Sequence, residues 1–515
     1  MKARRTHKLL LIFGGIAAYL LLLFLLVLVE KDAEGASILS LPLSFWYSVT
    51  TLTTVGYGDL YPVTFVGRII GFIFQLMSLG VLAAVFSLVY QLIHGRLLPR
   101  VKLLFSRQKT WYLFPEADEA SLLLAEKLAV MDKSSVVILP RKARSLASLH
   151  AVYTDIDAVN LCHMHPRPES VHVFLLQENG FANEKQASLL KPSRCKLYLL
   201  NDHEPNQIPE NVTYFDPAEG TARLYWHTYP LKKPDEQIIL VGSGRYGRAL
   251  LEQALMINVC SPDQAVSYRL FGDWSDFFRQ HPQLEKILMV NGKEPGRDSL
   301  LFREGAWNQN WQPYREADRI IFCEDDEENN AEKAFELLRY CPVRGTVYAR
   351  LDDAPEEIIG FGSQRELYSP ELIMQRTLNR LAMSLHENYR VSSGGNLPAW
   401  DALGSFLRRS NLASADHLFM KERILLKEDA GASQDFAKAA EIYASLSDEE
   451  KDKCRRIEHE RWCRFHYLNN WAFGPIRDNA ARIHPLLKPF DELSPEDQAK
   501  DDYAWELLSQ AAKTD

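Results

Sequence analysis

A short loop that contains two glycines has the residue types and spacing in this sequence that most clearly indicate a functional site. It reads Thr-Thr-Val-Gly-Tyr-Gly-Asp over residues 53–59 and follows an apolar stretch, residues 43–51, that is too short to span a bilayer. Ser40 and Pro42 predict a helix start there, as an N-cap followed by a proline in the first turn. The carboxyl end of a helix carries partial negative charge, so this helix would favour a cation beside the loop.

Two long apolar runs flank this loop, at residues 9–29 and 65–93. The first reaches about 30 Å as a helix, which is the thickness of a hydrocarbon core. A secretory signal peptide is the alternative, but its apolar region is shorter, about 7–15 residues. Irregular backbone at membrane depth is tolerated only where it lines a water-filled path or is buried in protein. We therefore expect a transmembrane helical hairpin with a re-entrant half-length helix and loop between its arms.

The charges around the two runs predict their orientation. Acidic residues dominate the connection between them, whereas basic residues lie before the first run and after the second: Lys2, Arg4, Arg5, Lys8, Arg96, Arg100 and Lys102. The positive-inside rule then places both termini in the cytoplasm. We expect two transmembrane helices in the inner (plasma) membrane, with an intracellular body after about residue 100.

The loop also carries a family resemblance. Residues 54–58, Thr-Val-Gly-Tyr-Gly, resemble the selectivity filter of potassium channels, and the likeness continues to residue 64. In that family, backbone carbonyls from four subunits replace the water shell of the ion. The resemblance therefore implies a homotetramer in the lipid bilayer with K+ as the permeant ion. It assigns the filter to Thr54, Val55, Gly56, Tyr57 and Gly58, with K+ at the first four of these.

A glycine-rich turn at residues 242–247 is the second motif. It reads Gly-Ser-Gly-Arg-Tyr-Gly, follows an apolar strand at residues 237–241 and precedes a helical run. This order places pyrophosphate on the exposed amides of a helix N-terminus. Asp273 ends the next strand, 26 residues past Gly247, where a ribose-binding carboxylate belongs. Further predicted strands at residues 287–290, 319–323 and 346–350 indicate a parallel, Rossmann-like sheet.

Residues 235–390 resemble the regulator-of-potassium-conductance domain, known as RCK and similar to the TrkA-N domain. The resemblance implies NAD(H) or another adenine nucleotide as a small-molecule ligand, bound by Gly242, Ser243, Gly244, Arg245, Tyr246, Gly247 and Asp273. The alternative is that the glycines serve only a tight turn and helix packing, as in related domains that have lost their ligand.

The same strand–turn–helix pattern occurs 127 residues earlier, which indicates an internal repeat. The glycine positions there hold Pro115, Ala117 and Ala120, and acids crowd the predicted helix start. Carboxylates at a helix N-terminus repel phosphate, so we expect this first unit to be structural. Its strands are predicted at residues 111–114, 136–139, 171–176 and 196–199.

An acidic run at residues 324–328 follows a predicted strand of the second unit. Clustered carboxylates suit Ca²⁺, although acids at a helix N-terminus on a solvated face are the simpler interpretation. The net charge of −8 disfavours a nucleic-acid partner, because binding to phosphate backbones needs a basic surface.

The last third of the chain is rich in charged helices. His-Glu-Arg-Trp at residues 459–462, Asn-Trp-Ala-Phe-Gly-Pro from residue 470 and Pro-Phe-Asp-Glu-Leu from residue 489 resemble the ryanodine-receptor repeat (RyR) domain. The resemblance implies a site for a nucleotide-like ligand, with candidate contacts at Arg461, Trp462, Trp471 and Arg477. Tryptophan can stack on a base and arginine can pair with a phosphate. The alternative is that both tryptophans belong to the core.

These features predict a multi-domain chain: an α-helical pore hairpin, two Rossmann-like α/β units and a mainly helical C-terminal domain. The expected boundaries are residues 1–100 for the pore, 105–232 and 235–391 for the two α/β units, 392–396 for a linker and 397–515 for the RyR-like part.

We expect a tetrameric, ligand-gated potassium channel that is not an enzyme, and two alternatives remain open. One is a membrane-tethered NAD-dependent oxidoreductase. The other is a stress or phage-defence effector, a channel opened by a nucleotide messenger at the RyR-like part.

Overall fold

A computed structural model of the chain describes residues 2–93, 97–146, 149–202, 205–303, 305–427 and 435–514. The chain forms two compact units. One contains the residues up to Phe105 together with residues 154–156, and the other contains the remainder.

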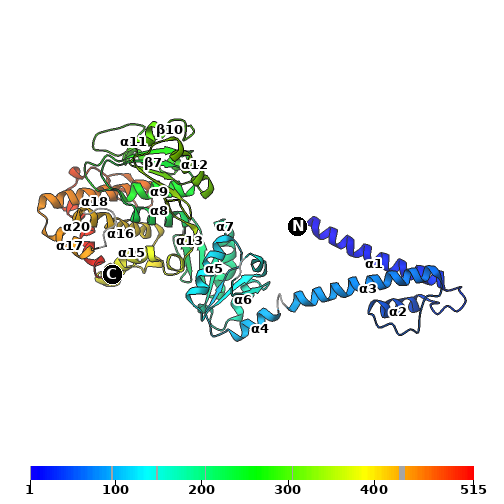
Figure 1. Ribbon diagram of the computed structural model, residues 1–515. Coiled ribbons are helices and arrows are strands. Elements are labelled where there is room, and N and C mark those ends of the chain that lie inside the picture. The colour runs from blue at the N-terminus through cyan, green and yellow to red at the C-terminus, as the bar shows by residue number, and fades with distance from the viewer. Residues whose placement is uncertain are drawn as a thin grey trace. The chain divides into compact units, whose positions relative to one another are not determined.

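The first unit is helical. Helix α1 runs over Lys2–Glu30, α2 over Leu41–Leu52, α3 over Phe65–Leu92 and α4 over Leu98–Phe105, and α2 lies beside α1 and α3 (Figure 1). Among the described residues, α3 is the one helix long and apolar enough to cross a membrane by length and composition, and Ala17–Glu30 is a shorter apolar stretch. The predicted helical hairpin with a short helix between its arms is confirmed.

The start of α2 differs from the prediction in one detail. Ser40 occupies the N-cap position in an extended conformation, but its side chain makes no capping hydrogen bond. Pro42 stands at the second helical position and has no N–H, so it removes one of the two amides to which an N-cap side chain can bind. A small apolar core then joins the three helices, formed by Leu23, Leu26, Ile38, Tyr47, Ile70 and Phe74.

The second unit contains two parallel sheets. The first sheet has the order β3-β2-β1-β4-β5-β6, with strands Trp111–Leu113, Val136–Pro140, Val152–Thr154, Val171–Leu175, Lys196–Leu200 and Val212–Phe215 numbered along the chain. Helices α5 (Glu119–Met131), α6 (Ala158–Met164), α7 (Gly180–Leu190) and α8 (Pro217–Thr228) lie between or after these strands. The four predicted strands are present, and β3 and β6 are additional.

The second sheet has the order β13-β12-β11-β7-β8-β10-β9. Its strands are β7 (Gln237–Val241), β8 (Ser267–Phe271), β9 (Met289–Val290), β10 (Ser299–Arg303), β11 (Arg319–Phe322), β12 (Thr346–Arg350) and β13 (Ile359–Phe361). Ile238 and Leu240 face one apolar core, whereas Ile239 and Val241 face another. Alternation along the strand therefore buries both faces, as expected for a parallel sheet covered by helices.

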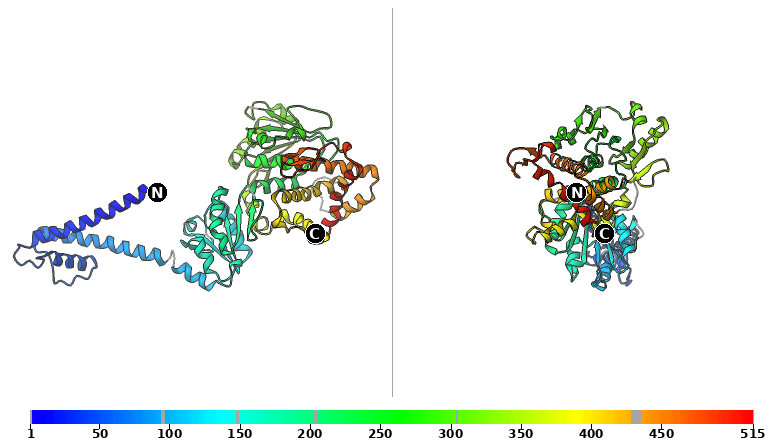
Figure 2. Two further views of the ribbon diagram at one scale, coloured as in Figure 1. Left: turned by 180° about the vertical axis from the view of Figure 1, so that it is seen from behind. Right: turned by 90° about the vertical axis from the view of Figure 1, so that its left-hand side faces the viewer.

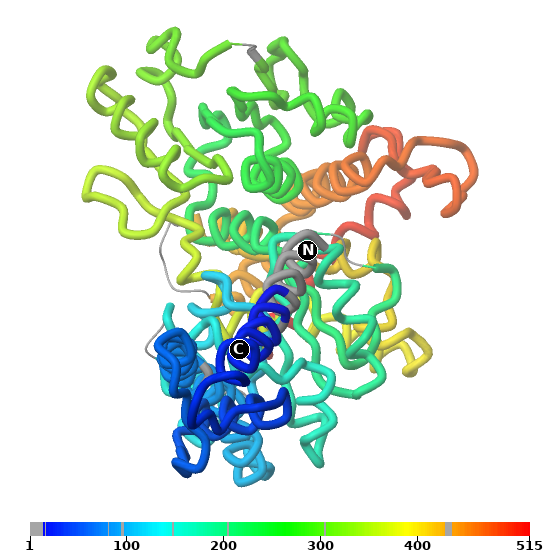
Figure 3. Tube along the Cα trace, turned by 90° about the vertical axis from the view of Figure 1, so that its right-hand side faces the viewer, coloured from blue at the N-terminus to red at the C-terminus, as the bar shows by residue number. Residues whose placement is uncertain are grey.

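Helices of the C-terminal part share the core of the second sheet. Helices α16 (Ser405–Leu426) and α18 (Asp448–Leu468) contribute Ala413, Met420, Phe465 and Leu468 to the cluster that contains β7, β8 and α9 (Arg245–Ile257). A buried ion pair reinforces this contact, with Arg464 Nη1 2.8 Å from Asp298 Oδ2. Figure 2 shows these parts as one body, and Figure 3 shows α18 in orange beside α9 in green.

Shorter elements complete this unit. Helices α13 (Gln364–Leu367) and α14 (Pro370–Ile373) pack against α5, so Leu367 and Ile373 belong to the core of the first sheet. The remaining α-helices and strands are α10 (Ser275–Gln280), α11 (Gln312–Glu316), α12 (Glu327–Tyr340), α15 (Thr377–Ser392), α17 (Phe436–Ser445), α19 (Pro495–Ala499), α20 (Asp502–Ala511) and the pair β14 (Ala472–Phe473) and β15 (Ile483–His484).

Candidate functional site

The predicted filter loop has a backbone of alternating handedness. Thr54, Gly56 and Gly58 have φ angles of +60°, +51° and +74°, and the residues between them are not in this region. Such alternation turns successive peptide groups toward the same side of the loop. The carbonyl of Thr50, in the last turn of α2, accepts hydrogen bonds from the amides of Val55 (2.9 Å) and Gly56 (3.1 Å), which ties the loop to the helix.

Trp46 of α2 braces this loop. Its ring is parallel to that of Tyr57 within 3°, with ring centroids 6.0 Å apart, and its Nε1 donates to Asp59 Oδ2 at 3.2 Å. The side chains of Val55 and Tyr57 are otherwise exposed. Sequence reasoning treated Trp46 only as an apolar helix residue. The available indication was the polar N–H of the indole, which usually finds a hydrogen-bond partner.

Glu30 fixes the segment that follows the loop. Its buried carboxylate accepts hydrogen bonds from the amides of Val63 (2.8 Å) and Thr64 (2.9 Å) and from the Thr64 hydroxyl (2.5 Å). Thr64 in turn caps α3 by accepting from the amide of Gly67. Glu30 therefore holds the beginning of α3 at the end of α1, a role that its sequence position did not indicate.

The glycine-rich turn between β7 and α9 has the close packing that its sequence predicts. Gly242 has a φ of +124°, and a Cβ there would lie 2.6 Å from the amide nitrogen of Glu324. A Cβ on Gly247 would collide with the carbonyl oxygen of Gly242. Gly244 is the N-cap of α9, and Ser243 approaches Gly272, which precedes Asp273. The turn thus brings the predicted glycines and Asp273 to the same edge of the sheet.

A carboxylate of the same chain occupies the start of α9. Asp325 accepts hydrogen bonds from the amides of Arg245 and Tyr246, each at 3.2 Å. These are the amides that sequence reasoning assigned to pyrophosphate. The Arg245 side chain is also engaged, because its Nη2 lies 2.8 Å from Asp216 Oδ1. In this arrangement, a phosphate would have to displace Asp325.

Asp273 is exposed, and it accepts a hydrogen bond from the amide of Ser275 at 3.0 Å. Hydrogen bonding from Ser275 lowers the pKa of Asp273 below its ordinary value. The carboxylate is therefore charged at neutral pH and available to a ligand from solvent.

The acidic run after β11 is dispersed among separate partners. Glu324 pairs with Lys333, Asp326 caps α12, and Glu327 lies 2.8 Å from Arg350. Within the part of the chain that the structure describes, no group of three or more histidine, cysteine or acidic residues could hold a metal ion. The run matches the simpler interpretation, acids at a helix N-terminus, and gives no support for a Ca²⁺ site.

A cavity of about 500 Å³ lies in the C-terminal part. Residues of α15, α16, α18 and the segment 477–507 line it. Three of the four residues predicted for ligand contact are among them: Arg461, Trp462 and Arg477. Trp471 is not, because it is buried against Phe406 at a centroid distance of 5.1 Å. For Trp471, the core interpretation applies.

Buried charges surround this cavity. Glu458 accepts from Arg461 Nη2 at 2.6 Å and from Lys421 Nζ at 2.9 Å. Burial alone would raise the pKa of Glu458, but Arg461 and Lys421 hold it well below its ordinary value. His459 also lines the cavity. Burial by itself lowers its pKa, but hydrogen bonds to Asp501 and Cys463 outweigh burial and raise it to about 11.

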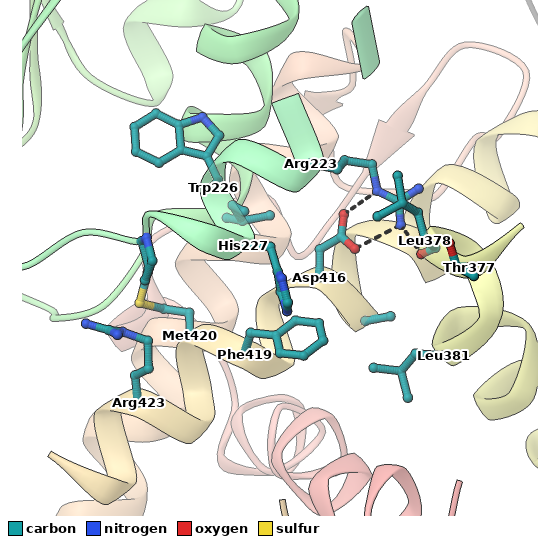
Figure 4. Close-up of a pocket in the computed structure, with 13 residues that line it drawn as sticks. Arg223, Trp226, His227, Thr377, Leu378, Leu381, Asp416, Phe419, Met420 and Arg423 are labelled. Atoms are coloured by element: carbon teal, nitrogen blue, oxygen red, sulfur yellow. Dashed lines mark hydrogen bonds and ion pairs between the residues drawn. The ribbon is translucent and has the colours of Figure 1, made fainter. Parts of the chain in front are cut away.

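A second, mostly apolar cavity of about 150 Å³ lies among α8, α15 and α16 (Figure 4). Arg223 of α8 crosses its edge: Nε lies 2.8 Å from Asp416 Oδ2, and Nη1 lies 2.6 Å from Asn379 Oδ1. Gln253 of α9 also donates to Asp416. This network connects the C-terminal helices to the two helices that flank β7.

The N-terminal part of the chain is similar to ion channels. Residues 7–94 match the family model described as "Ion channel". The chain is 36% identical over 73 residues to the potassium voltage-gated channel protein Shal of Drosophila melanogaster. This match covers 14% of this chain and 13% of Shal. The chain is also 37% identical over 73 residues to the human A-type voltage-gated potassium channel KCND3, and this match covers 14% of this chain and 11% of that channel. The chain therefore spans about an eighth of the length of these relatives.

Solved structures of the GsuK channel are also similar to this chain. The structure described as GsuK bound to ADP has a TM-score of 0.32 and 13% identity, and the match covers 70% of this chain and 96% of that one. The structure described as the GsuK channel bound to NAD has a TM-score of 0.30 and 11% identity, and the match covers 73% and 85%.

Proposed function

We propose that the chain is one subunit of a homotetrameric potassium channel in the inner (plasma) membrane, with residues 54–58 as its filter. The observation that carries the proposal is the alternating backbone of this loop, at a site within the part that matches the ion-channel family. Carbonyl oxygens of Thr54, Val55, Gly56 and Tyr57 would replace the water around K+. Because one chain supplies one strand of the filter, four copies surround the conduction axis.

The surface of α3 supports a membrane position. Phe72, Leu79 and Phe86 are 58%, 65% and 66% exposed. Apolar surface of this kind requires cover by lipid or by other protein. We place α1 and α3 across the bilayer with both termini in the cytoplasm, in agreement with the basic residues that flank the two runs.

We further propose that the second α/β unit binds NAD(H) or another adenine nucleotide, with Gly242, Ser243, Gly244, Arg245, Tyr246, Gly247 and Asp273 as its contacts. The close-packed turn and the nearby carboxylate of Asp273 support this site. Tandem α/β units from four subunits would form a cytosolic ring. A nucleotide would open or close the pore through different affinities for two states of that ring.

We propose that the chain is a channel and not an enzyme. The carboxylates near the glycine turn are engaged by other groups of the chain, since Asp273 accepts from the amide of Ser275, Asp325 accepts from the amide of Arg245, and Glu324 pairs with Lys333. The protein is expected to bind NADH without consuming it, so the absorbance of NADH should stay constant during prolonged incubation. Steady loss of that absorbance at catalytic protein concentration would favour the membrane-tethered oxidoreductase.

Ion flux into liposomes tests the channel. Reconstituted wild-type protein should take up Rb+ against a K+ gradient, and Gly56→Ala should reduce this uptake, because alanine disfavours a φ of +51°. Gly35→Ala is the matched control: it also replaces a glycine of positive φ (+79°) with open space around it, but outside the filter. Equal uptake by both variants would contradict the assignment of the loop.

A further inference from the structure

Helix α4, which follows α3 in the first unit, has an exposed apolar stripe (Figure 1). Four exposed apolar side chains share one face of this helix at spacings of three and four residues: Leu98, Val101, Leu104 and Phe105. Phe105 is 89% exposed. The opposite face contains Pro99 and Leu103, which are buried. Protein therefore covers one side of α4, and the apolar stripe on the other side requires cover of a different kind.

Basic residues flank this apolar stripe. Because successive residues of an α-helix are rotated by about 100°, Arg100 and Lys102 lie on its two sides. Both are exposed, as are Arg107 and Lys109 after the end of the helix. Residues 60–115 contain no acidic residue at all. The surface of α4 thus combines an apolar stripe with positive charge that no acid nearby in the sequence neutralises.

The length of α3 predicts the depth of α4 relative to a bilayer. Helix α3 has 28 residues, and at about 1.5 Å per residue it is about 42 Å long. A bilayer with its headgroups is about 40–45 Å thick. Only residues 93–97 separate the end of α3 from the start of α4. When α3 crosses the bilayer as proposed above, α4 begins at the level of the cytoplasmic headgroups.

From these observations we infer that α4 is an interfacial helix that binds anionic phospholipid. Its apolar stripe lies among the upper parts of the acyl chains, and Arg100 and Lys102 pair with the headgroup phosphates. A helix with basic residues beside an apolar face lies in the plane of the interface, and basic residues next to a transmembrane helix attract anionic lipids. Two copies of α4 packed on each other would bring like charges together, so charge favours lipid over a second copy.

This contact would also make the channel sensitive to the composition of the membrane. Helix α4 is the covalent connection between α3 and the first sheet, whose strand β1 begins at Trp111. Movement of the α/β units reaches the end of α3 along the chain only through α4. Anionic lipid that holds α4 at the headgroups changes the free energy of that movement. This regulation rests on the proposed channel function, whereas the lipid contact depends only on the membrane position of α3.

Fluorescence anisotropy of acyl-labelled phosphatidylglycerol tests the contact, with the purified full-length protein in a non-ionic detergent. This lipid should bind at least tenfold more tightly than phosphatidylcholine with the same label. Each basic residue at an anionic surface contributes about fivefold to affinity. Arg100→Gln combined with Lys102→Gln should therefore weaken binding about 25-fold. Arg339→Gln combined with Arg344→Gln is the matched control, because it removes two exposed charges from the other unit and should leave the affinity unchanged.

Two further measurements separate the apolar contact and the regulation. Phe105→Ser replaces a largely exposed side chain, so the fold is retained, and it should weaken both lipids about tenfold. In liposomes, Rb+ uptake by the wild type should differ at least twofold between phosphatidylcholine alone and a mixture with one quarter phosphatidylglycerol. The variant that lacks the charges of Arg100 and Lys102 should show no such difference.

The inference is overturned if the two lipids bind equally, or if both α4 variants bind phosphatidylglycerol as the wild type does. Displacement of the lipid by glycerol 3-phosphate would also overturn it, because the site would then be one for a soluble phosphate. Dissociation of the assembly by Phe105→Ser with unchanged lipid affinity would show that a second copy covers the stripe. Wild-type uptake that does not respond to phosphatidylglycerol would refute the regulation. Equal flux of Na+ and K+ with the lipid preference intact would refute the channel proposal alone.

Discussion

Replacing Asp325 with alanine should increase the affinity of the glycine turn for a nucleotide. The Asp325 carboxylate accepts hydrogen bonds from the amides of Arg245 and Tyr246 at 3.2 Å, where a pyrophosphate would otherwise bind. Its side chain is exposed, so its removal opens no cavity in the core. Any phosphate that reaches α9 must first displace this carboxylate, and the affinity is reduced by the free energy of that displacement.

The size of the effect follows from the contacts that are lost. A side chain that caps a helix N-terminus contributes about 0.5–2 kcal/mol, and a negative charge there adds about 0.3–1 kcal/mol. Asp325→Ala should therefore lower the free energy of unfolding by about 1–2 kcal/mol. It should strengthen binding of ADP or NAD by about 5–30-fold, since the same free energy no longer opposes the ligand.

Calorimetric titration of ADP and NAD measures the affinity, and urea denaturation measures the stability. Asp326→Ala is the matched control, because Asp326 caps α12 by accepting from Glu328 and makes no contact with α9. This control should lose similar stability with no gain in affinity. Unchanged or weaker nucleotide binding in Asp325→Ala would refute the reasoning.

Three further predictions concern other parts of the molecule. Arg464→Gln should cost about 3–5 kcal/mol of unfolding free energy in urea denaturation, because it leaves the buried charge of Asp298 without its cationic partner; a loss below 1 kcal/mol would contradict this. His459 has its pKa raised to about 11, so its stabilising charge is complete below pH 6.5 and is lost as pH rises toward 11. The difference in Tm between wild type and His459→Gln should therefore shrink from pH 6 to pH 9, and a constant difference would contradict this. Trp46→Leu removes the ring that stacks on Tyr57, and should reduce the ratio of Rb+ to Na+ uptake in liposomes; an unchanged ratio would exclude a bracing role.

Apolar periodicity predicted the regular elements well. Strand β7 carries four consecutive apolar residues between turn residues, and such a run is recognisable without knowledge of its neighbours. Strands β3 and β6 have only three and four residues with half-buried positions, so their patterns are too short to distinguish from loops. Strand β10 follows a polar loop and has only three apolar residues between Ser299 and Arg303, so its pattern also did not predict a strand.

Contacts between residues far apart in the chain could not be predicted from the sequence. Asp325 lies 80 residues from Arg245, and only the pairing of β11 beside β7 brings its carboxylate to α9. Trp462 and Trp471 belong to the same sequence motif, yet one lines a cavity and the other is buried in the core. The partners of Arg461 were equally hidden, because Lys421 approaches Glu458 only through the packing of α16 on α18.

The reversal potential of the reconstituted channel under opposed K+ and Na+ gradients tests the central proposal most directly. If carbonyl oxygens of residues 54–57 replace the water around K+, the reversal potential should shift by about 59 mV for each tenfold change in K+ concentration and should not respond to Na+. A reversal potential that follows Na+ and K+ equally would contradict the proposal.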